Sequence, residues 1–261
     1  MKTNLYTFTQ LPLLTVLACL LLTGCASNND ETPTYANGQK ISDPFEGYNR
    51  AGFKFNDALD QAVLEPTARG YKYVMPDFAE TGVRSAVRNL RSPLDFGNQV
   101  LQADFDGALG TLSRAMINTT FGVLGFVDLA ADAGIPYERE DFGQTLAVWG
   151  VGHGPYIVAP LIGPASLRDH LANFGEALVD PVRLYLFNTD EETTYYIITT
   201  TALLDRRVQL LDILADLRKN SIDYYASVRS LYYQNRQAMV NDMDPERERL
   251  PEIPDYSDED L

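Results

Sequence analysis

The sequence predicts an all-α fold in a single domain, and three observations carry that prediction. Apolar residues recur three or four positions apart in several segments, which is the period of a helix face. The one strongly β-branched run, residues 193–201, has no partner strand and leads directly into a helical pattern. The chain of 261 residues is also long enough to bury one sizeable core.

The first two helices are expected over residues 78–91 and 105–118. In the first, Val83, Val87 and Leu90 share one face, the arginines at 84, 88 and 91 lie away from it, and Ser92-Pro93 should end the helix. The second has its apolar face at Leu109, Leu112 and Met116, and Asp104 is expected to cap it.

Two further helices are expected near the C-terminus. One starts within residues 193–201 and continues over residues 202–219, with Leu204, Val208, Leu211 and Leu214 on one face. The other covers residues 222–240 and is rich in tyrosine.

The N-terminus carries a lipoprotein signal. Residues 1–24 contain one lysine followed by a short apolar run, as in a secretory signal peptide. Leu22-Thr23-Gly24-Cys25 resembles the bacterial lipobox, so Cys25 is the predicted lipid attachment site. The alternative is an ordinary cleaved signal with an incidental cysteine. Ala26 after the cysteine favours sorting to the outer membrane.

The remaining chain divides by composition. Residues 25–42 are polar and turn-rich and read as a flexible tether, and residues 43–241 are expected to form the helical domain. Residues 242–261 form an acidic tail, which is expected to be solvated and disordered, or else to dock a periplasmic partner. Because the only cysteines are Cys19 in the signal and Cys25, no disulfide is expected.

The charge excludes several partners. The formal net charge is −15, and a nucleic-acid partner needs clustered Lys and Arg for its phosphates. The same acidity argues against membrane binding through a basic patch.

Two segments without charged residues set the chain apart. Residues 142–167 contain no Asp, Glu, Lys or Arg in a chain that is 22% charged. Their glycines and prolines exclude a spanning helix, because non-helical backbone at membrane depth needs protein or a wet cavity around it. Residues 115–127 are similar. We interpret both as parts of a body that sits in lipid; the alternative is a buried loop layer of a soluble domain.

Enzyme motifs are weak. Residues 150–154 (G-V-G-H-G) are not a nucleotide loop, since Pro155 follows and no helix opens there. The only histidines are His153 and His170. Ser166 with His170 is a conceivable nucleophile and base, but Ser166 is more simply a helix cap, and His153 is expected to point at water or a headgroup. We expect no catalytic residue, metal or cofactor.

Several motifs, in order, resemble the MlaA (VacJ) family of outer-membrane lipoproteins. They are D-P-F-E-G-Y-N-R at 43–50, F-K-F-N at 53–56, I-N-T-T-F-G-V-L-G-F-V-D at 117–128, W-G-V-G-H-G-P-Y at 149–156, P-L-I-G at 160–163 and L-R-D at 167–169. The resemblance covers residues 43–236, most of the mature chain.

This resemblance implies a ring-shaped helical domain embedded in the inner leaflet of the outer membrane, with a central amphipathic channel. It implies association with a trimeric porin and transfer of mislocalised outer-leaflet phospholipid to a soluble periplasmic carrier. The family function is therefore intermembrane phospholipid transport that maintains lipid asymmetry. The rival hypotheses are a structural lipoprotein that only braces a porin and a lipid-hydrolysing enzyme.

The resemblance also assigns candidate residues. The early helix with Phe53, Phe55 and Asn56 matches the family's channel-gating segment, although its aromatic-Asn repeat is shorter here than in some members. The candidate channel or loop lining consists of Gly150, Gly152, His153, Gly154 and Tyr156. The residues expected to face lipid are Phe121, Leu124, Phe126, Trp149 and Ile157.

Overall fold

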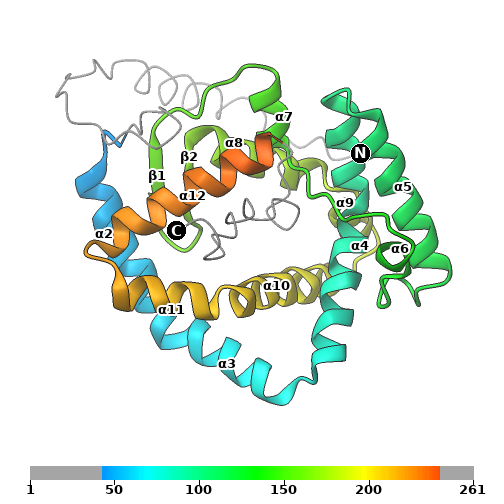
Figure 1. Ribbon diagram of the computed structural model, residues 1–261, viewed down its shortest axis with the longest axis horizontal. Helices are drawn as coiled ribbons and strands as arrows, with labels where there is room; N and C mark the ends of the chain where they lie inside the picture. The colour runs from blue at the N-terminus through cyan, green and yellow to red at the C-terminus, as the bar shows by residue number, and fades with distance from the viewer. Residues whose placement is uncertain (1–42, 242–261) are drawn as a thin grey trace, which may run out of the picture. The chain divides into compact units, whose positions relative to one another are not determined.

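The computed structural model describes residues 43–241, and these are mostly helical (Figure 1), as predicted. The elements are α2 (Glu46–Leu59), the π-helical turn η1 (Asp60–Leu64), α3 (Glu65–Val74), α4 (Asp77–Leu101), α5 (Phe105–Thr120), α6 (Leu129–Asp132), α7 (Phe142–Val148), β1 (Tyr156–Ala159), β2 (Gly163–Ser166), α8 (Leu167–Val179), α9 (Pro181–Asn188), α10 (Glu192–Gln209), α11 (Leu211–Asn220) and α12 (Tyr224–Val240). The predicted signal peptide, Cys25, the tether and the acidic tail lie outside the described residues.

The all-α fold class is confirmed, but the uncharged segment 142–167 also holds two short strands that were not predicted from the sequence. It contains the short helix α7 and then an antiparallel hairpin in which Tyr156 pairs with Ser166 and Ala159 with Gly163. The partner strand was hard to recognise because β2 reads G-P-A-S, which lacks the usual β-branched residues. Three residues connect the strands, and the chain turns with Leu161 among them and Gly163 at the start of β2 at positive φ, 68° and 106°.

Two helix boundaries also differ from the prediction. Helix α4 does not stop at Ser92-Pro93 but continues to Leu101, because Asp95, Asn98 and Gln99 beyond the proline are buried and two of them accept hydrogen bonds from other elements. This packing offsets the backbone bond that Pro93 cannot donate. The helix expected over 202–219 is two helices, α10 and α11, separated at Leu210.

Other predicted elements are confirmed. The β-branched residues 193–201 lie inside α10, α5 covers 105–118, and α12 covers most of 222–240. Asp104 caps α5 by accepting a hydrogen bond from the Gly107 amide at 3.0 Å. Val208 and Leu211 are buried together with Ala68 of α3, as the apolar face of that region predicted.

Packing contacts link the elements in a closed circuit. From α2 they run through η1 to α3, then to α10, α4, α7 and α8, and return through β2 and β1 to α2. Helix α12 contacts α7 and β2 of this circuit, and it also contacts α11. Segments far apart in the sequence, such as α3 and α10, therefore lie side by side.

Helix α5 is apolar on its exposed side and polar on its buried side. The exposed stripe repeats at helical spacing and consists of Phe105, Leu109, Leu112 and Met116. The buried positions are Ala108, Thr111, Arg114 and Asn118. An apolar stripe normally faces the core of a soluble domain. In α5 this orientation is reversed.

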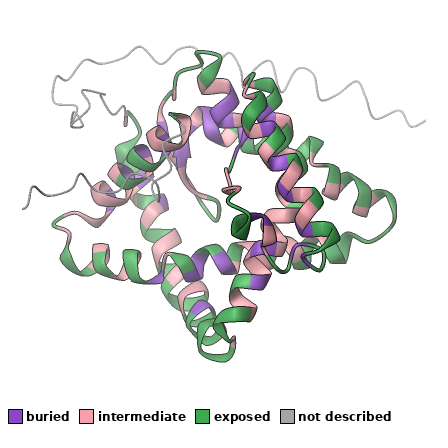
Figure 2. Cartoon of the chain, turned by 45° about the vertical axis from the view of Figure 1, so that its right-hand side comes forward, coloured by how far each residue is buried: buried purple, intermediate pink, exposed green. Residues whose placement is uncertain are grey.

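The same reversal occurs in other helices, whose buried and exposed residues are coloured in Figure 2. In α8 the buried residues are Arg168, Asp169, Ala172 and Glu176, and the exposed ones include Leu171, Phe174 and Leu178. In α4, Leu90 is exposed, while Arg84 and Arg91 turn inward to ion pairs with Asp205 and Glu176. This distribution is the opposite of the one typical of water-soluble domains, which bury apolar side chains and leave most charged ones exposed.

Buried charges are paired. Arg236 of α12 lies between two carboxylates, with its Nη2 atom 2.6 Å from Asp141 and its Nε atom 2.9 Å from Asp169. Arg168 bonds the same Asp169 at 2.9 Å. Burial alone would raise the pKa of Asp141, but the hydrogen bonds and charge of Arg236 outweigh burial and lower it to about 2. This network connects α12 with the start of α7 and with α8.

We expect Asp141→Asn to lower the free energy of unfolding by about 3 kcal/mol at neutral pH, because it breaks a buried ion pair. A carboxylate whose pKa is lower in the folded state stabilises fully above its unfolded pKa and loses that stabilisation as pH falls toward the folded value. With pKa values of 3.8 unfolded and about 2 folded, the difference between wild type and variant should shrink by about 1 kcal/mol from pH 5 to pH 3.

Denaturant unfolding of the purified protein in detergent measures this difference. Asp216→Asn, at an exposed position of α11, serves as the control and should show no such pH dependence. A constant wild-type-to-variant difference over this range would contradict the assignment.

Candidate functional site

Two asparagines of α2 bind the free edge of β1. Asn49 donates from Nδ2 to the Tyr156 carbonyl at 2.8 Å and accepts from the Val158 amide at 2.8 Å. Asn56 donates to the Ala159 carbonyl at 3.0 Å and accepts from the Leu161 amide at 2.8 Å. Each amide side chain thus replaces one residue of a neighbouring strand, and the edge of β1 is paired by a helix.

The spacing of the two asparagines suits this role. Seven residues along a helix advance about 10.5 Å at ~1.5 Å each, and both side chains lie on one face. The groups they bind are offset by three strand residues, about 10 Å at ~3.4 Å each. The two spacings agree, so both amides bind without distorting either element.

Gly52 lies between the asparagines on the same face and permits the close approach. A Cβ atom at this position would lie 2.8 Å from the Val158 carbonyl oxygen, inside van der Waals contact. Any side chain would push α2 away from β1 and lengthen the asparagine hydrogen bonds. We call Asn49, Gly52 and Asn56 the asparagine clamp.

The clamp includes one of the predicted gating residues and explains another part of the motif. Asn56 belongs to it, whereas Asn49 and Gly52 were not assigned a role from the sequence. The available signal was the recurrence of Asn at positions i and i+7 with Gly at i+3, which places the three residues on one helix face.

The hairpin tip held by Asn56 is apolar and exposed. Leu161 and Ile162 have 74% and 78% of their surface exposed. Leu161 adopts positive φ, a conformation that costs energy for a residue with a γ-branched side chain. The Asn56–Leu161 hydrogen bond fixes this residue, so the clamp positions the tip.

Aromatic side chains hold the other face of the hairpin. The Tyr156 ring is fully buried, with ring centroids 6.2 Å from Tyr225, 5.8 Å from Tyr232 and 5.8 Å from Tyr233. Phe53 of α2 joins this group at 5.5 Å from Tyr225. Tyr156, a candidate for the channel or loop lining, thus has a buried ring that fills the contact between β1 and α12.

Arg50 connects the clamp helix to α12. Its Nη2 atom lies 2.6 Å from Asp223, the N-cap residue of α12, and its guanidinium stacks 4.5 Å from the Tyr225 ring centre. The third predicted gating residue, Phe55, points away from these contacts and is 53% exposed. The D-P-F-E-G-Y-N-R motif thus supplies Asn49 to β1 and Arg50 to α12.

The glycine loop before β1 is conformationally unusual. Gly150 and Gly154 have φ of 88° and 66°, which side chains disfavour, whereas Gly152 has ordinary φ and open space around its Cα. His153 does not point freely at water as expected. Its ring packs edge-on against Tyr233 at 5.5 Å, and burial lowers its pKa.

The pair proposed for hydrolysis does not assemble. Ser166 is fully buried, and its Oγ accepts a hydrogen bond from the Asp169 amide, so it caps α8 as predicted. The His170 ring bonds the Ile157 carbonyl at 3.1 Å. Among the described residues, no group of three or more His, Cys, Asp or Glu is placed to hold a metal ion.

The residues expected to face lipid occupy different environments. Phe121 and Leu124 are each 73% exposed in the turn after α5, and Trp149 is half exposed with Nε1 donating to the Leu101 carbonyl at 3.0 Å. Phe126 is partly exposed and its ring lies over Gly82 of α4, while Ile157 is half-buried. In the part of the chain that the structure describes, no helix is both long and apolar enough to cross a bilayer.

Comparisons with known proteins agree on one family. The model of the MlaA lipoprotein family matches residues 41–239. The chain is 32% identical to the intermembrane phospholipid transport system lipoprotein MlaA of Haemophilus influenzae, covering 94% of this chain and 96% of that protein. It is 33% identical to the protein of the same name from Escherichia coli K12, covering 86% of each.

An uncharacterized protein of Rickettsia felis is 36% identical over 77% of this chain and 79% of its own length. A chain from a structural study of the maintenance of bacterial outer-membrane lipid asymmetry is similar in fold, with a TM-score of 0.65. It is 33% identical in sequence, and the match covers 77% of this chain and all of that one.

We expect Asn49→Ala to lower the free energy of unfolding by about 2–4 kcal/mol, because it leaves two buried backbone groups unpaired. Asn56→Ala should cost about 1 kcal/mol, since water reaches its partners at the tip. Hydrogen exchange should accelerate at the Val158 amide in the first variant and at the Leu161 amide in the second. Asn220→Ala, on exposed α11, is the control, and unchanged exchange in both clamp variants would refute the clamp.

Gly52→Ala should destabilise the protein by about 1–3 kcal/mol, because the added methyl group meets the Val158 carbonyl. Gly47→Ala in the same helix has open space and should stabilise by about 0.5–1 kcal/mol through helix propensity. Denaturant unfolding of both variants gives the comparison. Equal effects of the two substitutions would contradict the close approach of α2 to β1.

Proposed function

Because the chain belongs to the MlaA lipoprotein family, we propose that it is the lipoprotein component of an intermembrane phospholipid transport system. In this role it is anchored through Cys25 at the periplasmic face of the outer membrane. It removes mislocalised phospholipids from the outer leaflet and hands them to a soluble periplasmic carrier, which maintains lipid asymmetry. It acts without catalysing a reaction and without a cofactor.

The reversed burial of the helices is the observation that carries this proposal. The leucine, phenylalanine and methionine side chains named above for α5 and α8 face outward, and the buried residues of both helices are mostly polar or charged. Exposed apolar surface on this scale favours a protein or membrane contact. Hydrocarbon around α5 and α8 would bury the apolar stripes while the ion pairs stay inside the protein.

A polar interior also suits the transport of a headgroup. Moving a charged group through the bilayer centre costs at least ~3 kcal/mol even on the mildest scale, whereas a path lined by polar groups removes most of that cost. The closed circuit of packed elements supports a ring-shaped domain around such a path. The lipid tails would remain next to apolar residues such as Phe121 and Leu124, which are exposed.

We assign gating to the contact between α2 and the hairpin. Asn56 and Phe53 connect the helix to β1 and α12, and the tip residues Leu161 and Ile162 are exposed and apolar. If the asparagine clamp is released, the tip loses its link to α2 and can move. Gly150, Gly152 and Gly154 provide the flexible approach to the hairpin.

The proposed partners are phospholipid, a trimeric outer-membrane porin and the periplasmic carrier. The exposed stripe of α5 also favours a second function, a lipoprotein that only braces a porin, because a protein surface would cover that stripe as well as lipid does. The two functions predict different effects when the gene for this protein is deleted. Transport predicts a change in the phospholipid content of the outer leaflet, and bracing predicts only a change in porin stability.

A deletion strain complemented with variants tests the proposal. Labelling of outer-leaflet phosphatidylethanolamine should rise on deletion and return to normal with the wild-type gene. Cys25→Ser should fail to restore it because the anchor is lost. Gly152→Val should restore it only in part, because the added side chain restricts the backbone of the loop that leads to the hairpin. Gly152 has open space around its Cα, so the variant should still fold.

Gly47→Ala, in open space on α2, is the matched glycine control and should complement fully. Protein level and localisation are measured for each variant. Unchanged labelling in the deletion strain with a loss of porin would support the brace instead.

A further inference from the structure

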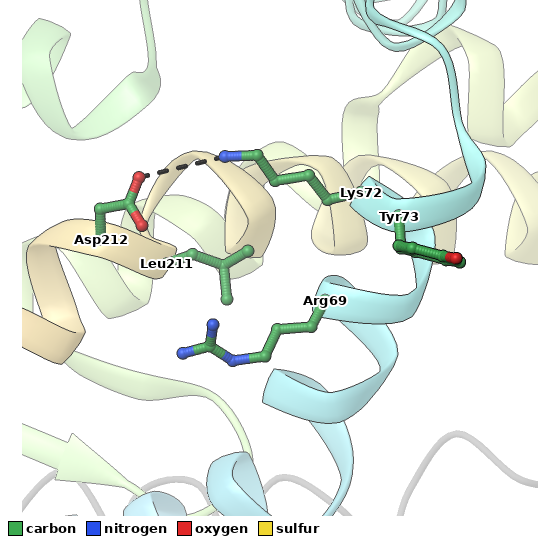
Figure 3. Close-up of a pocket in the computed structure, with 5 residues that line it drawn as sticks. All are labelled: Arg69, Lys72, Tyr73, Leu211 and Asp212. Atoms are coloured by element: carbon green, nitrogen blue, oxygen red, sulfur yellow. Dashed lines mark ion pairs between the residues drawn. The ribbon is translucent and has the colours of Figure 1, made fainter.

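A pocket of about 330 Å³ lies between α3 and α11, outside the hairpin and the clamp. It is lined by Arg69, Lys72, Tyr73, Leu211 and Asp212. Figure 3 shows Arg69 and Lys72 extending from α3 on either side of Leu211, with Lys72 directed at Asp212. None of these residues takes part in the proposed transport path.

The two cations of the pocket are incompletely neutralised. Lys72 Nζ is 4.0 Å from an Asp212 carboxylate that is 93% exposed, so this pair is weak. Arg69 binds Glu65 at 2.8 Å, but Glu65 also binds Arg218 at 2.9 Å and lies 3.6 Å from Arg207. Glu65 is thus shared by three guanidinium groups, of which Arg207 and Arg218 also bind Asp60 and Asp57. Arg69 has only Glu65 as an ion-pair partner among the described residues, and its Nη1 makes no hydrogen bond there.

Apolar groups adjoin these cations. Leu211 is 3% exposed and belongs to the buried cluster with Ala68 and Val208, so it forms a firm floor. Tyr73, which also lines the pocket, is 91% exposed. Two positive charges next to a leucine floor and an exposed aromatic residue suit an anion that carries hydrocarbon, because a free anion would use only the charges.

We propose that this pocket binds the phosphate diester of an anionic phospholipid headgroup. Arg69 and Lys72 donate to the phosphate oxygens, and Tyr73 contacts the glycerol and the first part of the acyl chains. Asp212 competes with the phosphate for Lys72. The site gives the lipoprotein a second lipid contact, and its occupancy requires neither a partner protein nor transport.

The test uses the full-length lipoprotein in detergent micelles, titrated with dihexanoyl phosphatidylglycerol and followed by calorimetry and by ³¹P NMR line broadening. Arg69→Gln and Lys72→Gln should each weaken binding about tenfold, the equivalent of one charge-assisted hydrogen bond. Asp212→Asn should strengthen binding several-fold. Lys219→Gln, on an exposed lysine of α11 outside the pocket, should leave it unchanged.

The opposite effects of Asp212→Asn and Lys72→Gln separate a binding site from a loss of folding, which would weaken binding in both. Inorganic phosphate that displaces the lipid at equal concentration would show a site for the ion alone and overturn the proposal. So would dihexanoyl glycerol binding as tightly as the phospholipid, or a peptide of residues 242–261 binding more tightly. Labelling of outer-leaflet phosphatidylethanolamine in cells that carry Lys72→Gln tests transport separately from the titration. Normal labelling supports the transport role whether or not the pocket binds lipid.

Discussion

The structure depends on pairing polar groups inside a body whose apolar side chains face outward. Arg236 between Asp141 and Asp169, and Arg91 between Asp95 and Glu176, lie where a soluble domain would place leucines. An unpaired charge at such a site is strongly destabilising, so every helix that contributes a charge is fixed relative to its partner. The apolar side chains are thereby released from core packing and are available to the surroundings. Specific pairing, rather than apolar volume, positions the elements around the hairpin.

The hairpin depends on the same principle. Its strands are four residues each, too short to be stable alone, and one edge of β1 would be left unpaired. Asn49 and Asn56 complete that edge, and Gly52 lets the helix approach closely enough for them to do so. A strand added from another segment would have been more stable, but it would have fixed the tip along its whole length. Two side-chain amides hold the hairpin at separate points, and the outer one, Asn56, can be lost without exposing the inner one.

Helix positions could be predicted from the sequence because apolar residues recur with a 3.6-residue period whether water or lipid surrounds the helix. The direction in which each apolar face points could not be predicted. Periodicity identifies an apolar stripe on α5, but it does not say whether protein or lipid covers that stripe. The hairpin was missed because Gly163-Pro164-Ala165-Ser166 has low strand propensity and gains its partner only through the fold. Helix α4 continues past Pro93 because residues distant in the sequence, Glu140 and Thr145, donate hydrogen bonds to Asp95 and Asn98 in its last turns. Of the candidate site, Asn56 was found through its motif, whereas Gly52 is explained only by a contact with Val158 more than a hundred residues away.

The turn after α5 shows what the outward apolar residues require of the backbone. Val123 and Leu124 both adopt positive φ, 54° and 56°, which costs of order 1 kcal/mol or more at each position. The turn is held by hydrogen bonds from the Gly125 amide to Asn118 and from the Val127 amide to Gly122. Glycine or asparagine would fit these angles without strain, and either would make the turn more polar or remove its side chains. The strain is consistent with a need for apolar side chains at this place, and the hydrogen bonds of the turn offset part of it. Contact of Val123 and Leu124 with hydrocarbon would offset the remaining strain, because fully burying one such side chain is worth about 1.5–3 kcal/mol.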